Sequence, residues 1–330
     1  MFVTLVRRPW LVLVGLALLA AAALVASVSI GSAGPGPVGL WRGLAAGTDP
    51  LARSLVLQLR LPRALTAFGA GALLALAGVC MQVLLRNPLA DPYVLGVSGG
   101  AAVAALTAML LGAGTFGVQG AAFGGALAAT LVVFTLAKGP GGWTPTRLLL
   151  TGVVVAAGTG ALVSLLLAAG DPTVLRGMVF WLMGDLSWAG SPVALLSLVA
   201  IAMPLGVLAA RPLNVLARGD VQAQLLGLPV APLRGALFVA ASVLTAATVT
   251  NVGSIGFVGL VTPHLVRLLI GSDHRRVVPA AALAGGTLVV IADLVSRTVL
   301  APRQLPVGAL TAIVGVPLFL ALMRRAQPAT

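Results

Sequence analysis

The chain has 330 residues, of which 59% are hydrophobic and 8% are charged, and its formal net charge at pH 7 is +13. Soluble domains carry about 25% charged residues, so this composition excludes an ordinary soluble protein. The basic residues are spread between apolar runs and form no patch interleaved with aromatic residues, which argues against nucleic-acid binding.

Most of the apolar runs are about 17 to 24 residues long, the length that an α-helix needs to cross about 30 Å of hydrocarbon. The period-two alternation of a membrane β-barrel is missing. We therefore expect an all-α membrane protein with a single transmembrane domain over residues 1–330. Prolines, glycines and charged clusters divide it into ten spans, which cover residues 10–30, 62–85, 94–112, 117–137, 147–169, 192–210, 232–252, 257–270, 278–300 and 307–323.

The first span has an apolar core longer than that of a secretory signal, so we expect it to be retained. Ten spans place both termini on one side of the membrane. With the N-terminus inside, the inner segments carry 13 basic residues, namely Arg7, Arg8, Arg86, Lys138, Arg147, Arg211, Arg218, Arg234, Arg267, Arg275, Arg276, Arg324 and Arg325. The outer segments carry seven, namely Arg42, Arg53, Arg60, Arg63, Arg176, Arg297 and Arg303. This asymmetry favours cytoplasmic termini, but the outer arginines are more numerous than topology requires.

Two inner loops combine proline with small polar residues. Residues 86–92, RNPLADP, join the second and third spans, and residues 144–147, TPTR, join the fourth and fifth. Proline lacks a backbone donor, and the residue before it avoids the helical conformation. The first loop is therefore predicted to be a sharp and rigid turn.

A polar island, ARGDVQAQLLGLPVAP at residues 217–232, interrupts the apolar sequence between the sixth and seventh spans. A helix of two turns is predicted from Asp220 to Leu226. Gly219 and Asp220 suit its start, where a side-chain oxygen can cap free N–H groups, and Gly227 suits a left-handed stop.

A second short helix is predicted from Pro212, at a first-turn position, to Arg218 and Gly219. Joined at residues 218–220, the two helices would form a compact knob on the inner side of the membrane. An ordinary polar loop fits the same composition equally well, and both interpretations stay open on physical grounds.

Residues 253–264, GSIGFVGLVTPH, are rich in glycine, yet the chain lacks GxxxxGK[ST] and GxGxxG, and its only lysine is Lys138. We therefore expect no Walker-type nucleotide site, no catalytic residue and no enzymatic activity in this chain. The glycines are expected to break or tightly pack the seventh and eighth spans. Cys80 is predicted to be a core residue, and His264 and His274 lack the neighbours of a metal site, so no metal is expected.

Asp293 is the one acidic residue well inside an apolar run, which makes it a functional candidate. Arg297 follows at i+4 and can pair with it on one helix face. A structural ion pair is favoured over a proton relay, because no second intramembrane acid is present to receive the proton.

Eight longer motifs follow one another from residue 60 to the C-terminus: RLPRAL (60–65), RNPLADPYVLGVSGGA (86–101), TPTRLLLTG (144–152), RPLNVLARGDVQAQLLGLP (211–229), GSIGFVGLVTPHLVRLL (253–269), DHRR (273–276), ADLVSR (292–297) and LPVGALTAIVGVPLF (305–319). In this order they resemble the permease family of bacterial type II ABC importers for iron chelates, haem and cobalamin, the FecCD-like permeases.

The resemblance implies a homodimer of ten-helix subunits around a central pathway in the bacterial inner membrane. Two ABC ATPase subunits would bind on the cytoplasmic side and a periplasmic substrate-binding protein on the other side. ATP and magnesium would bind to the partner ATPase, and no cofactor is expected in this chain. ATP binding in the partner would drive alternating access through the permease.

The resemblance also implies roles for particular residues. The ATPase-coupling helix would comprise Arg218, Gly219, Asp220, Ala223, Leu226 and Gly227. The inner gate would comprise Asn87, Leu89, Pro145 and Thr146, although Pro145 departs from the paired small hydroxyl residues common in the family. The binding protein would dock on Arg60, Arg63 and Arg297, which would explain the surplus of outer arginines.

The cargo is predicted from the general similarity of residues 171–188, DPTVLRGMVFWLMGDLSW, to haem-uptake permeases. Arg176 is a candidate contact for a haem propionate, and an ordinary interfacial charge is an equally good interpretation. A ferric siderophore is the second candidate and cobalamin the third. An ion-coupled secondary transporter is the alternative from another class, although one intramembrane carboxylate gives it little support.

Overall fold

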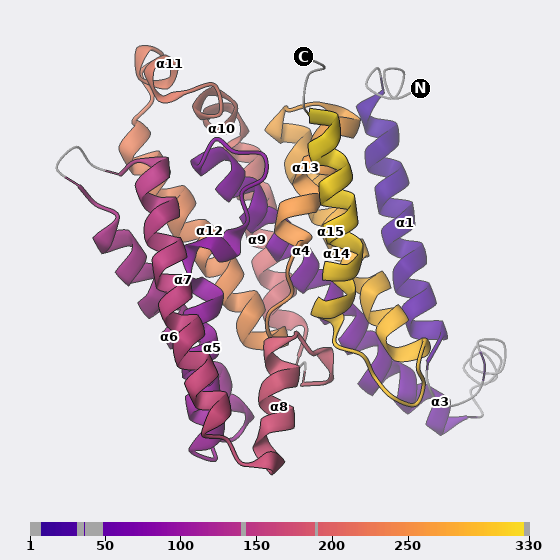
Figure 1. Ribbon diagram of the computed structural model, residues 1–330. Coiled ribbons are helices and arrows are strands. Elements are labelled where there is room, and N and C mark those ends of the chain that lie inside the picture. The colour runs from indigo at the N-terminus through magenta and orange to yellow at the C-terminus, as the bar shows by residue number, and fades with distance from the viewer. Residues whose placement is uncertain (1–7, 32–35, 37–48, 140–142, 189–190, 327–330) are drawn as a thin grey trace.

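The computed structural model describes residues 8–31, 36, 49–139, 143–188 and 191–326 as a bundle of helices (Figure 1). In chain order they are α1 (Pro9–Ser29), α3 (Pro50–Ser54), η2 (Leu55–Arg60), α4 (Leu61–Leu84), η3 (Pro92–Leu95), α5 (Val97–Leu110), α6 (Thr115–Leu136), α7 (Pro145–Ala168), α8 (Pro172–Leu182), η4 (Leu186–Trp188), α9 (Val193–Leu208), α10 (Ala210–Leu216), α11 (Asp220–Leu225), α12 (Val230–Val252), α13 (Val258–Ile270), α14 (His274–Thr298) and α15 (Val307–Ala326). Arg7 and Arg42, which the charge count includes, lie outside the described residues.

Each of the ten predicted spans coincides with a helix: α1, α4, α5, α6, α7, α9, α12, α13, α14 or α15. By length and composition, six helices of the described chain can cross a membrane, or seven if α9 and α10, which are bent by 62°, count as one span. α5, α13 and α15 are shorter apolar helices. The all-α membrane fold is therefore confirmed.

Two helical segments differ from the prediction. The second span is longer than expected and runs over Pro50–Leu84, because Asp49 caps its start by accepting hydrogen bonds from the backbone N–H groups of Leu51 and Ala52, each at 3.0 Å. Helix α8 lies in what was predicted to be an outer loop. Its 11 residues reach about 16 Å, too short to cross the membrane.

Helix α4 lies at the centre of the bundle, where it packs against α9, α12, α13 and α14. Small residues make these contacts close. A Cβ atom on Gly71 would overlap the carbonyl oxygen of Gly285 in α14, and one on Gly78 would overlap that of Gly259 in α13. Lipid provides no hydrophobic drive for helix association, so such close backbone packing stabilises the bundle through van der Waals contact.

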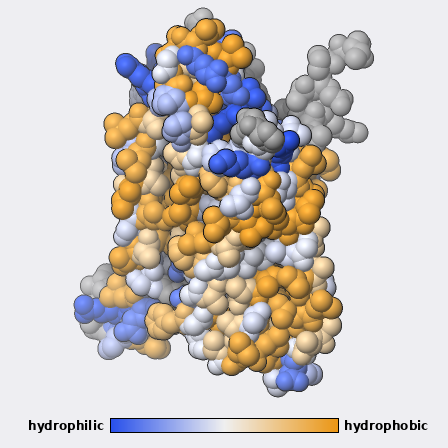
Figure 2. All heavy atoms as spheres, turned by 90° about the vertical axis from the view of Figure 1, so that its left-hand side faces the viewer, coloured by the Kyte–Doolittle hydropathy of each residue, from blue (hydrophilic) through white to orange (hydrophobic). Residues whose placement is uncertain are grey.

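The face formed by α6 and α7 is mostly hydrophobic across its middle, and hydrophilic side chains gather toward the end that carries α11 (Figure 2). Only 11% of the most apolar stretch of α7 is buried, against 83% of that in Pro50–Leu84. α1 begins and α15 ends at the same end of the bundle as α10 and α11 (Figure 1). This face therefore carries an apolar band across its middle, and the start of α1 and the end of α15 lie on the side of the polar island.

Candidate functional site

The polar island and the segment just before it fold into two short helices, close to the two that the glycines and prolines predict. α10 and α11 form a projecting knob, which comprises residues 210–227 (Figure 1). Gly219 has φ 126° and Gly227 has φ 75°, so each occupies a conformation that favours glycine. The alternative of an ordinary polar loop is wrong.

The knob is anchored by its inner face. Leu213, Leu216 and Ala223 are buried against Val83 of α4 and Leu237 of α12. On the opposite side, three large apolar side chains of α11 and its end are exposed, namely Val221, Leu225 and Leu226. The knob thus presents an apolar tip away from the bundle.

Asp220 does not cap α11 as expected. The N-cap position is Gly219, and no side chain caps it. The Asp220 carboxylate instead accepts a hydrogen bond from Nη2 of Arg234 in α12 at 2.7 Å and lies 3.6 Å from Nη2 of Arg86 in the first inner turn. The two cations outcompete the local backbone donors, because a charge-assisted hydrogen bond is stronger than a neutral one.

The first inner turn is fixed by its own side chains. Oδ1 of Asn87 accepts a hydrogen bond from the N–H of Leu89 at 2.9 Å, and Oδ1 of Asp91 accepts one from the N–H of Tyr93 at 2.8 Å. Burial raises the pKa of Asp91 to about 6, although the hydrogen bond from Tyr93 opposes this shift. The predicted sharp turn is confirmed.

The second inner turn begins α7. Oγ1 of Thr144 caps the helix by accepting a hydrogen bond from the N–H of Arg147 at 3.3 Å, and Pro145 occupies the first helical turn. Thr146 is exposed and Pro145 is partly buried. Both turns lie at the knob end of the bundle (Figure 1), so the structure brings the four predicted gate residues to the same side as the coupling segment.

At the other end of the bundle, Asp293 pairs with two arginines. Nε of Arg297 lies 3.1 Å from its carboxylate, as the i+4 spacing predicts. Nη2 of Arg63 in α4 lies 2.8 Å from the same carboxylate, which the sequence did not predict. The Asp293 side chain is fully buried, and the pair ties the start of α4 to the end of α14.

The predicted docking residues are unequally accessible. Arg60 and Arg297 are only 5% and 6% exposed. Arg60 donates to the carbonyl oxygens of Val28 and Ser29, and Arg297 donates to the carbonyl and hydroxyl oxygens of Ser27. These two guanidinium groups turn inward because the last turn of α1 leaves carbonyl groups without helical partners. Arg63 alone of the three is more than a tenth exposed, at 15% of its side chain.

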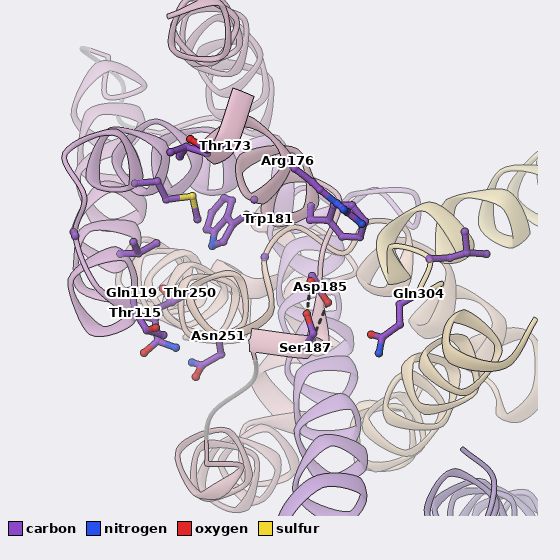
Figure 3. A pocket seen from close by; sticks show the side chains of 18 of the residues that line it. Thr115, Gln119, Thr173, Arg176, Trp181, Asp185, Ser187, Thr250, Asn251 and Gln304 are labelled. Carbon is purple, nitrogen blue, oxygen red and sulfur yellow. Dashed lines mark hydrogen bonds between the residues drawn. The ribbon is translucent and has the colours of Figure 1, made fainter. Parts of the chain in front are cut away.

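A cavity of about 1050 Å³ opens on this outer side between α8, the facing ends of α5, α6 and α12, and the loop before α15 (Figure 3). Its polar lining includes Thr115, Gln119, Thr173, Arg176, Asp185, Ser187, Thr250, Asn251, Arg303 and Gln304. Arg176 lies over the Phe180 ring, 5.6 Å from its centroid, and Asp185 is held by Ser187. The cavity combines aromatic faces with hydrogen-bonding groups, as small-molecule sites do.

Arg176 was predicted as a candidate cargo contact, and the structure places it in this cavity. Arg303, Gln304 and Asn251 were not predicted. The only sequence signal for them was the count of Arg303 among the surplus outer arginines. Among the described residues, no three His, Cys, Asp or Glu side chains come together as a metal site.

The glycine-rich segment breaks the chain between α12 and α13, as predicted. Residues 253–257 are not helical, and the Tyr93 hydroxyl is hydrogen-bonded to both the carbonyl and the N–H of Ile255, at 3.1 and 3.0 Å. Gly253 has φ 70° and lines the outer cavity. Irregular backbone at this position therefore borders a cavity, where membrane proteins tolerate it.

Apolar helices long enough to cross a membrane, with a knob at one end of the bundle and a polar cavity at the other, indicate a multi-pass membrane protein. The chain belongs to the FecCD transport family, which it matches over residues 18–325. It is a transmembrane permease subunit of an ABC transporter.

Known proteins of this kind are similar over most of their length. The hemin transport system permease protein HmuU of Yersinia pestis is 41% identical over 277 residues, which cover 82% of this chain and 83% of HmuU. The cobalamin import system permease protein BtuC of Halobacterium salinarum is 42% identical over 283 residues, which cover 84% of this chain and 75% of that protein.

Solved structures share the fold. A metal-chelate type ABC transporter in an inward-facing conformation has a TM-score of 0.83 and 33% sequence identity, and the match covers 95% of this chain and 98% of that one. PsaBC from Streptococcus pneumoniae has a TM-score of 0.57 at 16% identity over 86% of this chain and 94% of that one, which indicates a common fold alone.

Proposed function

We propose that the chain is the permease of a type II importer that moves haem from a periplasmic binding protein to the cytoplasm by alternating access. Two copies would enclose the pathway. α7 would contribute to the contact between the two copies, because so little of it is buried within a single chain. ATP and magnesium would bind to two partner ATPase subunits. The knob end and both chain ends would lie in the cytoplasm, and the protein in the bacterial inner membrane.

The knob is proposed to dock in the ATPase. Leu226 and Arg218 are exposed and would contact the partner, whereas Ala223 is fully buried and would support the helix from behind. Gly219 and Gly227 would set the shape of the knob. The inner gate would form at Asn87, Leu89, Pro145 and Thr146.

Docking of the binding protein is proposed in a revised form. Arg63 would meet an acidic group directly, and Arg60 and Arg297 would hold the end of α1 in place beside it. Such rim charges favour encounter and orientation more than affinity.

The observation that supports haem as the cargo is the composition of the outer cavity. Its lining includes two exposed arginines, Arg176 and Arg303, and two aromatic residues, Phe180 and Trp181, and Arg176 lies over the Phe180 ring. Haem is a flat apolar macrocycle with two carboxylates, so it matches aromatic faces and a pair of cations. A ferric siderophore is the second candidate, supported by the similarity to a metal-chelate type transporter. Cobalamin is the third, supported by the relatives named for its import.

Uptake into proteoliposomes tests the cargo. The permease is reconstituted with its ATPase and binding protein, and ATP-dependent uptake of haem, a ferric siderophore and cobalamin is compared. We expect haem to be transported, and Arg176→Gln with Arg303→Gln to raise the KM for haem several-fold. Arg53→Gln, an exposed outer arginine away from the cavity, serves as the control. Uptake of cobalamin or siderophore but not haem would reject haem, and uptake on an ion gradient without ATPase would reject the ATP-driven mechanism.

A further inference from the structure

Asp220 of the knob lies between two arginines that belong to different elements. Arg234 belongs to α12, and its bond of 2.7 Å is short and well shielded, with 11% of the Arg234 side chain exposed. Arg86 belongs to the first inner turn, and its distance of 3.6 Å is longer, with 38% of the Arg86 side chain exposed. One contact is therefore tight and the other loose.

The backbone of Arg86 is in a conformation that suits glycine. Its φ is 50°, and it follows the end of α4, where its N–H bonds to the carbonyl of Val83. A residue other than glycine is strained in the left-handed conformation. Glycine would relax this turn, so the presence of arginine here indicates a use for the side chain.

That side chain reaches over the knob. A Cβ atom on Gly219 would lie 3.7 Å from Nη1 of Arg86, so the guanidinium passes above the joint between α10 and α11. Among the described residues, Oδ1 of Asp220 is buried without a hydrogen-bond partner. Both arginines contact Oδ2, so the carboxylate keeps one acceptor free for a donor when the arginines or the knob move.

Arg234 extends the same cluster to the second inner turn. Its Nη1 donates to the carbonyl oxygen of Trp143 at 3.4 Å, one residue before Thr144, which caps α7. Asp220 is therefore linked to each inner turn through one arginine side chain. Arg86 belongs to the first turn, residues 86–92, and Arg234 is hydrogen-bonded to the second, residues 143–147.

We propose that Arg86 and Arg234 are positioning residues that transmit movement of the knob to the inner gate, with Asp220 as their common partner. Arg234 keeps the knob attached to α12, and the Arg86–Asp220 contact tightens and loosens as the first inner turn moves. This inference rests on the proposed coupling role of the knob.

Distances between spin labels test the proposal without knowledge of the cargo. In a Cys80→Ala background, one pair of labels at Leu225 and Phe116 reports the knob against the outer end of α6. A second pair at Pro88 and Phe116 reports the first inner turn. All three positions are exposed. The labelled permease is assembled with its ATPase and measured without nucleotide and with ADP and vanadate.

In the parent protein we expect both distances to shift when ADP and vanadate bind. In Arg86→Gln and in Asp220→Asn the knob should still shift, whereas the shift of the inner turn should fall to less than half. Asp220→Asn also weakens the pair with Arg234, so the double variant should be no worse than Asp220→Asn alone. Arg276→Gln, an exposed arginine at the start of α14, is the matched control and should change neither shift.

Arg86→Gly separates coupling from folding. Glycine relaxes the left-handed backbone, so the thermal stability of this variant should be equal or higher while the inner-turn shift is lost. A normal inner-turn shift in Arg86→Gly or Arg86→Gln would overturn the proposal. Absence of a knob shift in the parent protein would instead reject the coupling role of the knob.

Discussion

Arg63 and Asp293 lie 230 residues apart in the sequence, yet Nε and Nη2 of the guanidinium both bond to Oδ1 of the carboxylate, at 2.9 and 2.8 Å. Arg297 adds a second cation to the same acid. The arrangement joins α4 to α14 at their outer ends. Because Asp293 lies fully inside the protein, its charge is stable there only in the presence of these partners.

Replacing Asp293 by asparagine should therefore destabilise the fold strongly. The change leaves the buried Arg297 without its counter-charge, and loss of one partner of a buried pair costs about 3–5 kcal/mol. We expect the thermal midpoint in detergent to fall by several degrees. Arg63→Gln should cost less, since Arg297 still pairs with the acid. A midpoint equal to that of the parent protein for Asp293→Asn would show that the ion pair does not stabilise the fold.

Gly227→Val should uncouple the ATPase. Valine at φ 75° is strained by roughly 1–2 kcal/mol, so the end of α11 is expected to change shape. ATP hydrolysis by the reconstituted complex should lose its stimulation by the loaded binding protein, and transport should fall more than tenfold. Gly235→Val, at a helical position of α12 with open space around it, provides the comparison. Coupled transport at the parent rate in Gly227→Val would contradict the assignment of the knob.

Arg63→Gln should weaken docking of the binding protein. The Kd, measured by biolayer interferometry on the nanodisc-embedded complex, is expected to rise several-fold at low salt and less at high salt, because salt screens the attraction between Arg63 and acidic groups of the binding protein. Arg60→Gln should lower thermal stability with little change in Kd, since Arg60 is buried against the end of α1. Equal Kd values for Arg63→Gln and the parent at low salt would leave the outer arginines with a structural role only.

The stability of the protein should depend on Asp91. Its folded-state pKa of about 6 exceeds the ordinary value of 3.8, so the native state binds this proton more tightly than the unfolded chain. The free energy of unfolding should therefore be highest below about pH 4 and fall, by on the order of 2 kcal/mol, as the pH rises to about 6. Asp91→Asn keeps an acceptor for the Tyr93 N–H and should lose this dependence. Thermal midpoints across this range check it, and parallel curves for the two proteins would contradict it.

Local features of the sequence predicted much of the fold and part of the site. The knob followed from glycine and proline positions, and the Asp293–Arg297 pair followed from i+4 spacing. Each depends on backbone preferences or on neighbours within one helical turn.

What the sequence did not predict depends on contacts between distant segments. Arg63 pairs with Asp293 only because α4 and α14 pack side by side. In the same way, Asp220 pairs with Arg234 of α12 instead of capping the start of α11. The outer cavity draws its lining from several segments that share no local pattern. Helix α8 is too short to give the hydropathy signal of a span, so hydropathy alone predicts a loop at these residues.

The glycine contacts of α4 have a mechanical consequence. Gly71 meets the backbone of Gly285, and Gly78 meets that of Gly259, with no side chain between them that can change rotamer. Sliding α4 along α13 or α14 would drive carbonyl oxygens into Cα atoms, so these three helices are expected to travel as one rigid block. Any opening and closing of the permease must then hinge outside that block, among helices such as α7 that have few interior contacts to break.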